Sequence, residues 1–275
     1  MKSYWDSLAH QFQHQQPPLR PCAEDLRLLH QNVRDWQAQN PQRHLRVLLF
    51  GVTPEIAGFL WPANTSLLAV EKSRAMIDLI WPGNISGKRE VVSGNWFDID
   101  LEEASFDFVV GDGFSTGFAY PVDYEKIAGN ISQWLKPDGR LIARLFVRTE
   151  KRETHETIMT DLRSGNIKRF DILKWRLGMA LQENMQQGVI VDEIYRAWKR
   201  IEEQWPSLPE DAGWPRPTVD IIKLYEGRTD RYAFPAIEEL NDAFSNDLKP
   251  VSTTFPDYDF GECCPTVVYS QRDGG

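Results

Sequence analysis

The sequence predicts an α/β fold: a doubly wound, mostly parallel sheet with N-terminal helices, a helical insertion and an antiparallel closing strand pair. Short apolar runs alternate with helical patterns from Leu45 to Arg148, as in a parallel sheet flanked by helices. Helical periodicity extends through residues 149–245, and strand-like runs return in residues 246–275. We therefore expect an N-terminal helical cap (1–44), a ligand-binding α/β core (45–148), the insertion (149–245) and a strand pair that closes the core (246–275).

The N-terminal cap is expected to contain one or two helices interrupted by a proline-rich turn. Pro17, Pro18 and Pro21 break any helix there, because proline lacks the backbone N–H and clashes with the preceding turn. Apolar residues then recur three or four positions apart, which predicts a helix with one buried face. These residues are Leu26, Leu29, Val33 and Trp36.

The core begins with a short, continuous apolar run, LRVLLFG, which Gly51 closes. Such a run is typical of a central parallel strand that is buried on both faces. Thr53 is a suitable N-cap for the next helix, in TPEIAGFL, and Pro54 stands where a first-turn proline is tolerated. Later strands are expected in SLLAVE, REVVSGNW, SFDFVVGDG and KPDGRLIARLFVR, with helices in KSRAMIDLI and VDYEKIAGNISQWL.

Composition and charge narrow the possible functions. The net charge of −9 argues against a nucleic-acid partner, since phosphate binding requires a cationic surface. No apolar run is long enough to cross a bilayer, and the N-terminus is too polar for a secretory signal. The three cysteines do not suggest a disulfide framework, and the five histidines lack metal-ligand spacing. We expect a cytoplasmic protein with no membrane, nucleic-acid or metal partner.

The residues that suggest a binding site follow the ends of the predicted strands. Ligands of open α/β sheets bind at the carboxyl ends of the strands. The turn at Gly51 allows a close approach to the start of the next helix, which can bind a carboxylate or phosphate. Glu71 ends the second strand, where a carboxylate can accept two hydrogen bonds from a ribose diol. This spacing favours a nucleoside-containing cofactor.

Two further strand ends carry residues that suit the same ligand. Asn95 and Trp96 follow the third strand, where the amide can bind the edge of an adenine and the indole can form a wall. Asp112 ends the fourth strand between two glycines, and Phe114 and Phe118 are expected to flank the pocket.

Segment by segment, the chain resembles class I S-adenosylmethionine-dependent methyltransferases, which have a Rossmann-like fold. The similar segments are LRVLLFGVTPEIAGFL, LLAVEKSRAMID, VVSGNWFDI, FDFVVGDG and WLKPDGRLIARLF. The most specific is LKPDGRLI, a helix end and Pro/Gly turn before the fifth strand. The resemblance implies S-adenosylmethionine as cofactor, with Gly51, Val52 and Thr53 at its methionine end, Glu71 and its neighbour Lys72 at the ribose, Asn95 and Trp96 at the adenine, and Asp112, Gly113 and Phe114 near the sulfonium.

Two features depart from the family pattern. The first loop reads FGVTPE, with one glycine where the family usually has several. Asn95 stands where the family usually has aspartate; the amide keeps an acceptor and adds donors.

The resemblance implies transfer of a methyl group to an acceptor, which we expect to be an unidentified small molecule. Such transfer depends chiefly on in-line positioning, so it requires no particular catalytic residue, and none is assigned. Asp112, Tyr120 and His155 are the candidates near the site. The insertion is the expected acceptor region, although it could instead be helical cover or the interface of a homodimer. The N-terminal cap could form a lid, with Arg20 reaching the cofactor carboxylate or the acceptor.

Three alternatives remain from the sequence. A protein that binds S-adenosylmethionine or its demethylated product without transferring methyl groups, as a sensor or inactive partner, would tolerate the reduced glycine loop. An aminopropyl transferase similar to spermidine synthase would need paired acidic residues for a polyamine. A dinucleotide oxidoreductase would need G-x-G-x-x-G after the first strand, where this chain has GVTPEI.

Overall fold

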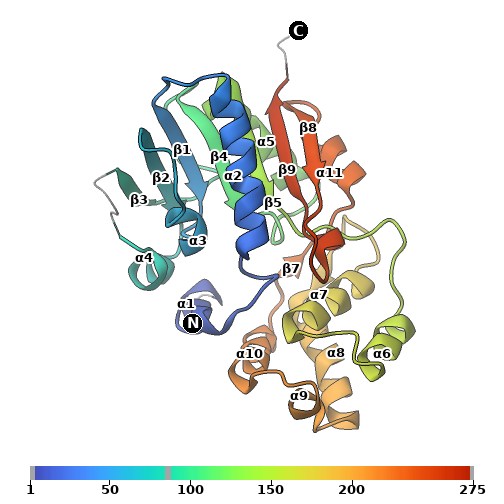
Figure 1. Cartoon of the computed structure of the whole chain (residues 1–275). Coiled ribbons are helices and arrows are strands. Elements are labelled where there is room, and N and C mark those ends of the chain that lie inside the picture. Colours follow the sequence, from blue (N-terminus) through green and yellow to red (C-terminus); the bar gives the residue numbers. More distant parts are fainter. Residues whose placement is uncertain (1–3, 84–87, 273–275) are drawn as a thin grey trace.

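The computed structural model describes residues 4–83 and 88–272, and its centre is a seven-stranded sheet (Figure 1). The strand order is β3-β2-β1-β4-β5-β9-β8. The five parallel strands are β1 (Leu45–Phe50), β2 (Thr65–Glu71), β3 (Arg89–Ser93), β4 (Phe106–Asp112) and β5 (Leu135–Arg144). The antiparallel strands are β8 (Leu248–Thr254) and β9 (Thr266–Gln271). The predicted mostly parallel sheet with its closing antiparallel pair is confirmed.

The strand order reverses at β1, which pairs with β2 on one side and β4 on the other. This reversal separates the helices that follow β1 and β4, which is where α/β sheets bind ligands. The apolar run suggested a fifth strand that reaches Arg148, but β5 ends at Arg144. Beyond Arg144 the backbone bonds to loops instead: the N–H of Leu145 donates to the carbonyl of Pro265, and that of Val147 to Cys263.

Helices cover both faces of the sheet (Figure 1). On one face lies α2 (Ala23–Ala38), which buries Leu29, Val33 and Trp36 against β1, β4 and β9. On the other lie α5 (Val122–Trp134) and α11 (Ile237–Phe244). The buried apolar positions of α2 are three or four residues apart, as the sequence predicted, so the helix packs through one continuous stripe.

The helices nearest the strand ends are short. After β1, α3 (Pro54–Ala57) has only four residues, so the helix predicted in TPEIAGFL stops early. Gly58 ends it, and the Trp61 indole N–H donates to the carbonyl of Ile56 at 3.1 Å. After β2, α4 (Arg74–Ile80) begins at Ser73, whose hydroxyl accepts a hydrogen bond from the Met76 N–H.

Between β5 and β8 the chain forms a helical group with its own apolar core, beyond the carboxyl ends of the strands (Figure 1). Its helices are α6 (His155–Arg163), α7 (Phe170–Leu181), α8 (Val191–Gln204), α9 (Leu208–Asp211), α10 (Arg216–Asp220) and the 3₁₀ helix η3 (Ile221–Tyr225). The two-stranded sheet of β6 (Val189–Ile190) and β7 (Arg231–Tyr232) joins them. Trp198 and Trp214 pack around Phe170 at the centre, with ring centroids 4.8 and 5.6 Å away.

The N-terminal segment runs between the sheet edge and this helical group. It contains α1 (Tyr4–Ala9) and the 3₁₀ helix η1 (Phe12–His14). Its backbone binds the helical group: the Gln16 N–H donates to Asp171, and the His14 carbonyl accepts from Thr218. Residues 1–3 of the expected cap and 273–275 of the closing segment lie outside the described residues. Within the described part of the chain, every helix is too short or too polar to cross a bilayer.

Candidate functional site

Gly51 and Glu71 lie side by side at the carboxyl ends of β1 and β2. The register pairs Phe50 with Val70, and the Gly51 N–H donates to the Val70 carbonyl at 2.9 Å. Gly51 has a φ of +82°, a left-handed conformation that favours glycine. A Cβ at this position would stand 3.6 Å from Oε2 of Glu71. The turn therefore places backbone without a side chain beside a carboxylate.

The Glu71 carboxylate is positioned by the start of the loop that follows it. The Ser73 N–H donates to its Oε1 at 2.7 Å. Burial raises the pKa of Glu71, and hydrogen bonds from the Ser73 and Lys72 N–H groups oppose that rise. Lys72 itself is exposed. Glu71 is thus a pre-oriented acceptor, whereas the structure gives the Lys72 side chain no defined role.

Aromatic rings line the same edge of the sheet. Trp96 stacks on Phe50 at 5.1 Å between centroids, and its indole N–H donates to the Val70 carbonyl at 2.7 Å. Phe114 packs edge-on against Phe50 at 5.1 Å, and Phe118 lies 5.8 Å from Phe114. The predicted residues Trp96 and Phe114 are therefore brought together beside the end of β1, in one apolar wall.

Asn95 uses its amide within its own turn. Its Nδ2 donates to Asp98 at 2.7 Å, and its Oδ1 accepts from the Phe97 N–H at 3.3 Å. The side chain therefore caps the turn after β3. A cofactor ring could reach it only in competition with Asp98 and the Phe97 N–H.

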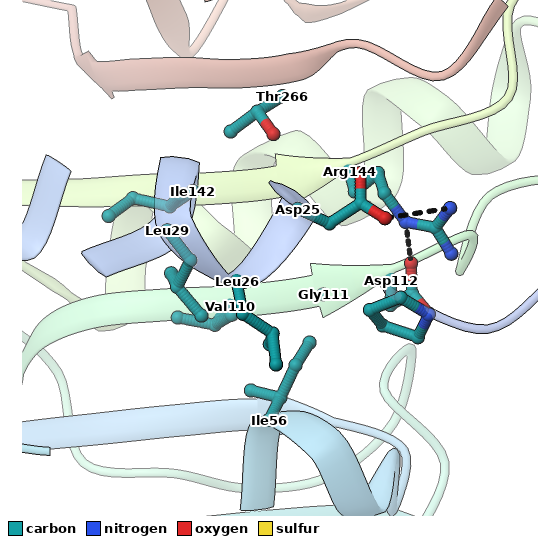
Figure 2. A pocket seen from close by; sticks show the side chains of 11 residues that line it. Asp25, Leu26, Leu29, Ile56, Val110, Gly111, Asp112, Ile142, Arg144 and Thr266 are labelled. Carbon is teal, nitrogen blue, oxygen red and sulfur yellow. Dashed lines mark hydrogen bonds and ion pairs between the residues drawn. The ribbon is translucent and has the colours of Figure 1, made fainter. Parts of the chain in front are cut away.

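Asp112 does not point freely into a site but forms a buried ion pair with Arg144, its register partner on β5. Arg144 Nε donates to Asp112 Oδ1 at 2.6 Å, and both side chains are almost fully buried. The guanidinium also donates to the Pro18 carbonyl at 2.6 Å. It lies 3.8 Å from the Asp25 carboxylate (Figure 2). Tyr258 in turn donates to Asp25.

These charges affect one another strongly. Burial raises the pKa of the Asp112 carboxyl, and attraction to Arg144 opposes that rise. For Arg144, burial works to lower the pKa, but Asp112 raises it well above its ordinary value. The Nη2 atom of Arg144 is buried and has no hydrogen-bond acceptor among the described residues. Arg144 therefore stays charged and keeps one donor unused.

A small cavity lies between α2 and the sheet beside this ion pair (Figure 2). Asp25, Leu29 and Ile142 are among the residues that line it. About 20 Å³ is open to the centres of water molecules, which suits about one water and is far too small for a nucleoside. This cavity is therefore not the cofactor site.

The N-terminal segment covers the loop after β1. Ala9 packs against Val52 and Met76, and the Ser73 hydroxyl donates to Asp6 at 2.9 Å. Farther along, Arg20 Nε donates to Glu55 Oε1 at 2.7 Å. Arg20 is thus held beside the start of α3, near Thr53, whose side chain makes no capping hydrogen bond.

The other candidates for proton transfer lie in different surroundings. The Tyr120 hydroxyl donates to the Glu239 carbonyl at 3.3 Å, and burial raises the pKa of this phenol. His155 is exposed at the first residue of α6. Across residues 4–83 and 88–272, no group of three or more His, Cys, Asp or Glu side chains could hold a metal ion.

The structure adds residues that the sequence analysis did not select. Arg144 interrupts the apolar run LIARLF, and Lys174 interrupts the apolar helix FDILKWRLGMAL three residues after Asp171. Charged residues are rarely buried unless they are paired, so each was a visible sign of a buried ion pair. Ser73 and Glu55 gave no comparable signal, because exposed polar residues are common near helix starts.

The comparisons with known proteins identify a fold. No protein-family model and no curated protein matches the sequence. Among solved structures, the N-methyltransferase NodS from Bradyrhizobium japonicum, in complex with S-adenosyl-L-homocysteine, aligns with a TM-score of 0.53 at 10% identity over 99% of this chain and 100% of that one. The Burkholderia thailandensis 1,6-didemethyltoxoflavin-N1-methyltransferase aligns with 0.53 at 14% identity over 98% and 86%.

A third solved structure carries a different name. A putative Zn-dependent alcohol dehydrogenase from Rhodobacter sphaeroides aligns with a TM-score of 0.56 at 13% identity, over 98% of this chain and 97% of that one. At such identities the similarity shows the fold alone.

Proposed function

We propose that this chain, which has the Rossmann-like fold of S-adenosylmethionine-dependent methyltransferases, binds S-adenosylmethionine and transfers its methyl group to a small-molecule acceptor. The contact between Gly51 and Glu71 carries the proposal. It brings together side-chain-free backbone after β1 and an oriented, half-buried carboxylate at the end of β2, at the strand ends where α/β sheets bind ligands.

The neighbouring residues suit the parts of this cofactor. Glu71 would accept hydrogen bonds from the ribose hydroxyls, and the apolar wall of Phe50, Trp96 and Phe114 would contact apolar parts of the nucleoside. The backbone of Gly51, Val52 and Thr53 would hold the methionine end. The ion pair of Arg20 and Glu55 lies beside it and offers a cation and an anion to the amino-acid group of the cofactor.

The cofactor would supply the methyl group, and the chain would supply position. In-line placement of two reacting atoms can provide roughly 7–11 kcal/mol of a barrier. Asp112 would contribute to this positioning through its ion pair with Arg144, because the ion pair fixes the loop of Gly113 and Phe114 at the tip of β4. We place acceptor recognition in the part of residues 149–245 that forms the helical group, since this group lies at the same end of the sheet (Figure 1).

Release of S-adenosylhomocysteine tests the activity. The wild-type protein would be incubated with S-adenosylmethionine and a library of small nucleophiles, and product formation would be measured by mass spectrometry. We expect acceptor-dependent product formation that Glu71→Ala reduces and that Glu90→Ala, on the exposed edge strand β3, leaves unchanged. Formation of product at equal rates by wild type and Glu71→Ala would contradict the proposed site.

A non-catalytic binding protein is the second candidate, and the position of α1 favours it. Ala9 covers Val52, and Asp6 holds the start of α4, so the loop after β1 is closed over. A sensor would bind S-adenosylmethionine or S-adenosylhomocysteine and signal through the movement of α1. Tight binding without turnover of any acceptor, together with a ligand-dependent change in proteolysis near residue 10, would favour this candidate.

A further inference from the structure

The side chain of Tyr4 inserts an aromatic ring from α1 into the helical group. Its ring lies 6.0 Å from that of Tyr225, and the Arg228 guanidinium lies over its face at 4.9 Å. Burial raises the pKa of its hydroxyl well above the ordinary value, and the neighbouring Tyr232 and Tyr225 also influence it. The rings of Tyr225 and Tyr232 lie 5.8 Å apart, so three phenol groups cluster here. Tyr225, Tyr232 and Arg228 thus surround the Tyr4 phenol.

The surroundings of this phenol-binding group contain polar atoms that a simple apolar core would not have. Lys174 is almost fully buried, pairs with Asp171 at 3.0 Å and lies 5.5 Å above the Tyr225 ring. Trp175 is also buried and lies 5.6 Å from the Tyr232 ring. Its indole N–H has no acceptor among the described residues. A buried donor without an acceptor is uncommon in folded proteins and indicates a place for a further polar group.

The element that carries Tyr4 is short and terminal, and it packs through the buried residues Leu8 and Ala9. α1 has only six residues, well below the length at which a helix is stable by itself. The next side chain, Trp5, is 53% exposed. Ser73 binds α1 through Asp6, and the Tyr4 ring provides the contact with the helical group. Local opening of so short a terminal element requires much less free energy than global unfolding.

We propose that the Tyr4 phenol occupies a pocket of the helical group that also takes a free phenol or a hydroxylated planar aromatic ring, which enters in exchange for Tyr4. The free ring would lie beneath Arg228 and hydrogen-bond to Tyr225 and Tyr232. A second oxygen on the ligand would find a donor in the Trp175 indole. Binding of a phenol in this pocket does not depend on the proposed function. Only the identification of the phenol as the methyl acceptor rests on that function.

Binding of p-cresol, the side-chain analogue of tyrosine, tests the exchange by ligand-observed NMR without any cofactor. Toluene is the matched ligand without a hydroxyl. We expect the wild-type protein to bind p-cresol about tenfold or more tightly than toluene, because the pocket's hydroxyls would lose a partner with toluene. Tyr232→Phe should remove most of this preference.

The variant Tyr4→Phe separates exchange from simple cavity filling. It keeps the ring of the competing side chain but removes its hydroxyl, so p-cresol should bind about fivefold more tightly than to wild type. Tyr195→Phe, on α8, removes the hydroxyl of a partly exposed tyrosine outside this group; it is the matched control and should not change the affinity. Equal affinity for p-cresol and toluene, or p-cresol binding only to a Tyr4→Ala variant, would overturn the proposal. If p-cresol binds but S-adenosylmethionine does not, the pocket stands and the proposed function fails.

Discussion

Oε2 of Glu71 lies 3.6 Å from the point where a Cβ on Gly51 would stand. The two residues belong to neighbouring parallel strands, and their contact joins a backbone turn to an oriented carboxylate. Any side chain at position 51 would stand between this carboxylate and a ligand that uses the turn.

Gly51→Ala should therefore weaken cofactor binding. The left-handed φ of +82° strains any residue other than glycine, so we expect a stability loss of about 1 kcal/mol or more. The affinity for S-adenosylmethionine should fall by more than this strain accounts for, because the alanine Cβ would lie beside the Glu71 carboxylate. Titration calorimetry and thermal denaturation would measure the two effects. Gly165→Ala, also at positive φ but with no neighbouring atom within 4 Å, provides the backbone control and should lower stability only.

Glu71→Gln should stabilise the unliganded protein at neutral pH. Burial raises the pKa of Glu71 in the folded state, so folding favours the protonated carboxyl. That contribution is fully present below the unfolded pKa of about 4.3 and is lost as the pH rises through the folded pKa. The variant should accordingly melt higher than wild type at pH 7, and the difference should shrink toward pH 4. Glu90→Gln, on an exposed edge, is the control. A lower melting temperature for Glu71→Gln at pH 7 would contradict this account.

Arg144→Met should lower the free energy of unfolding by about 3–5 kcal/mol, because it leaves the carboxylates of Asp112 and Asp25 buried without their cation. Urea denaturation would measure the loss. The double variant Asp112→Asn/Arg144→Met should recover part of it. Glu102→Gln removes one partner of an exposed ion pair and should change the unfolding midpoint little. A small effect of Arg144→Met would show that the ion pair does not hold the tip of β4.

Gln182→Leu should loosen the segment after β7, which the end of α7 holds through Gln182. The Gln182 amide is buried and binds the Phe234 backbone twice, donating to its carbonyl at 2.9 Å and accepting from its N–H at 2.7 Å. The leucine leaves both backbone groups unpaired, which costs about 1–3 kcal/mol for each buried group. Hydrogen exchange at Phe234 should accelerate. Unchanged protection of this amide would show that other contacts fix the segment.

Much of the fold could be predicted from the sequence because its signals are local. The apolar run before Gly51 and the helical stripe of Leu29, Val33 and Trp36 depend only on spacing along the chain. The proximity of Gly51 and Glu71 follows from the same signals, because two successive parallel strands place their carboxyl ends at one edge.

The contacts that shape the candidate site are not local, and the sequence did not predict them. The partner of Asp112 depends on the register of β4 with β5, which pairs it with Arg144. The hydrogen bond from Gln16 to Asp171 joins residues far apart in the sequence. Asn95 was expected at an adenine, yet its amide binds its own turn, since short side chains readily bond to nearby backbone. The cofactor-binding roles and the division of the chain into four segments stay predictions.

Titration calorimetry with S-adenosylmethionine and S-adenosylhomocysteine tests the central claim most directly. We expect both compounds to bind the wild-type protein. Glu71→Ala should lose roughly 1.5–3 kcal/mol of binding free energy, the scale of hydrogen bonds to a charged group, whereas Glu90→Ala should bind as wild type does. Binding that is the same for wild type and Glu71→Ala would remove Glu71 from the site. No heat with either compound, at concentrations far above those of a typical cofactor, would contradict the assignment of S-adenosylmethionine itself.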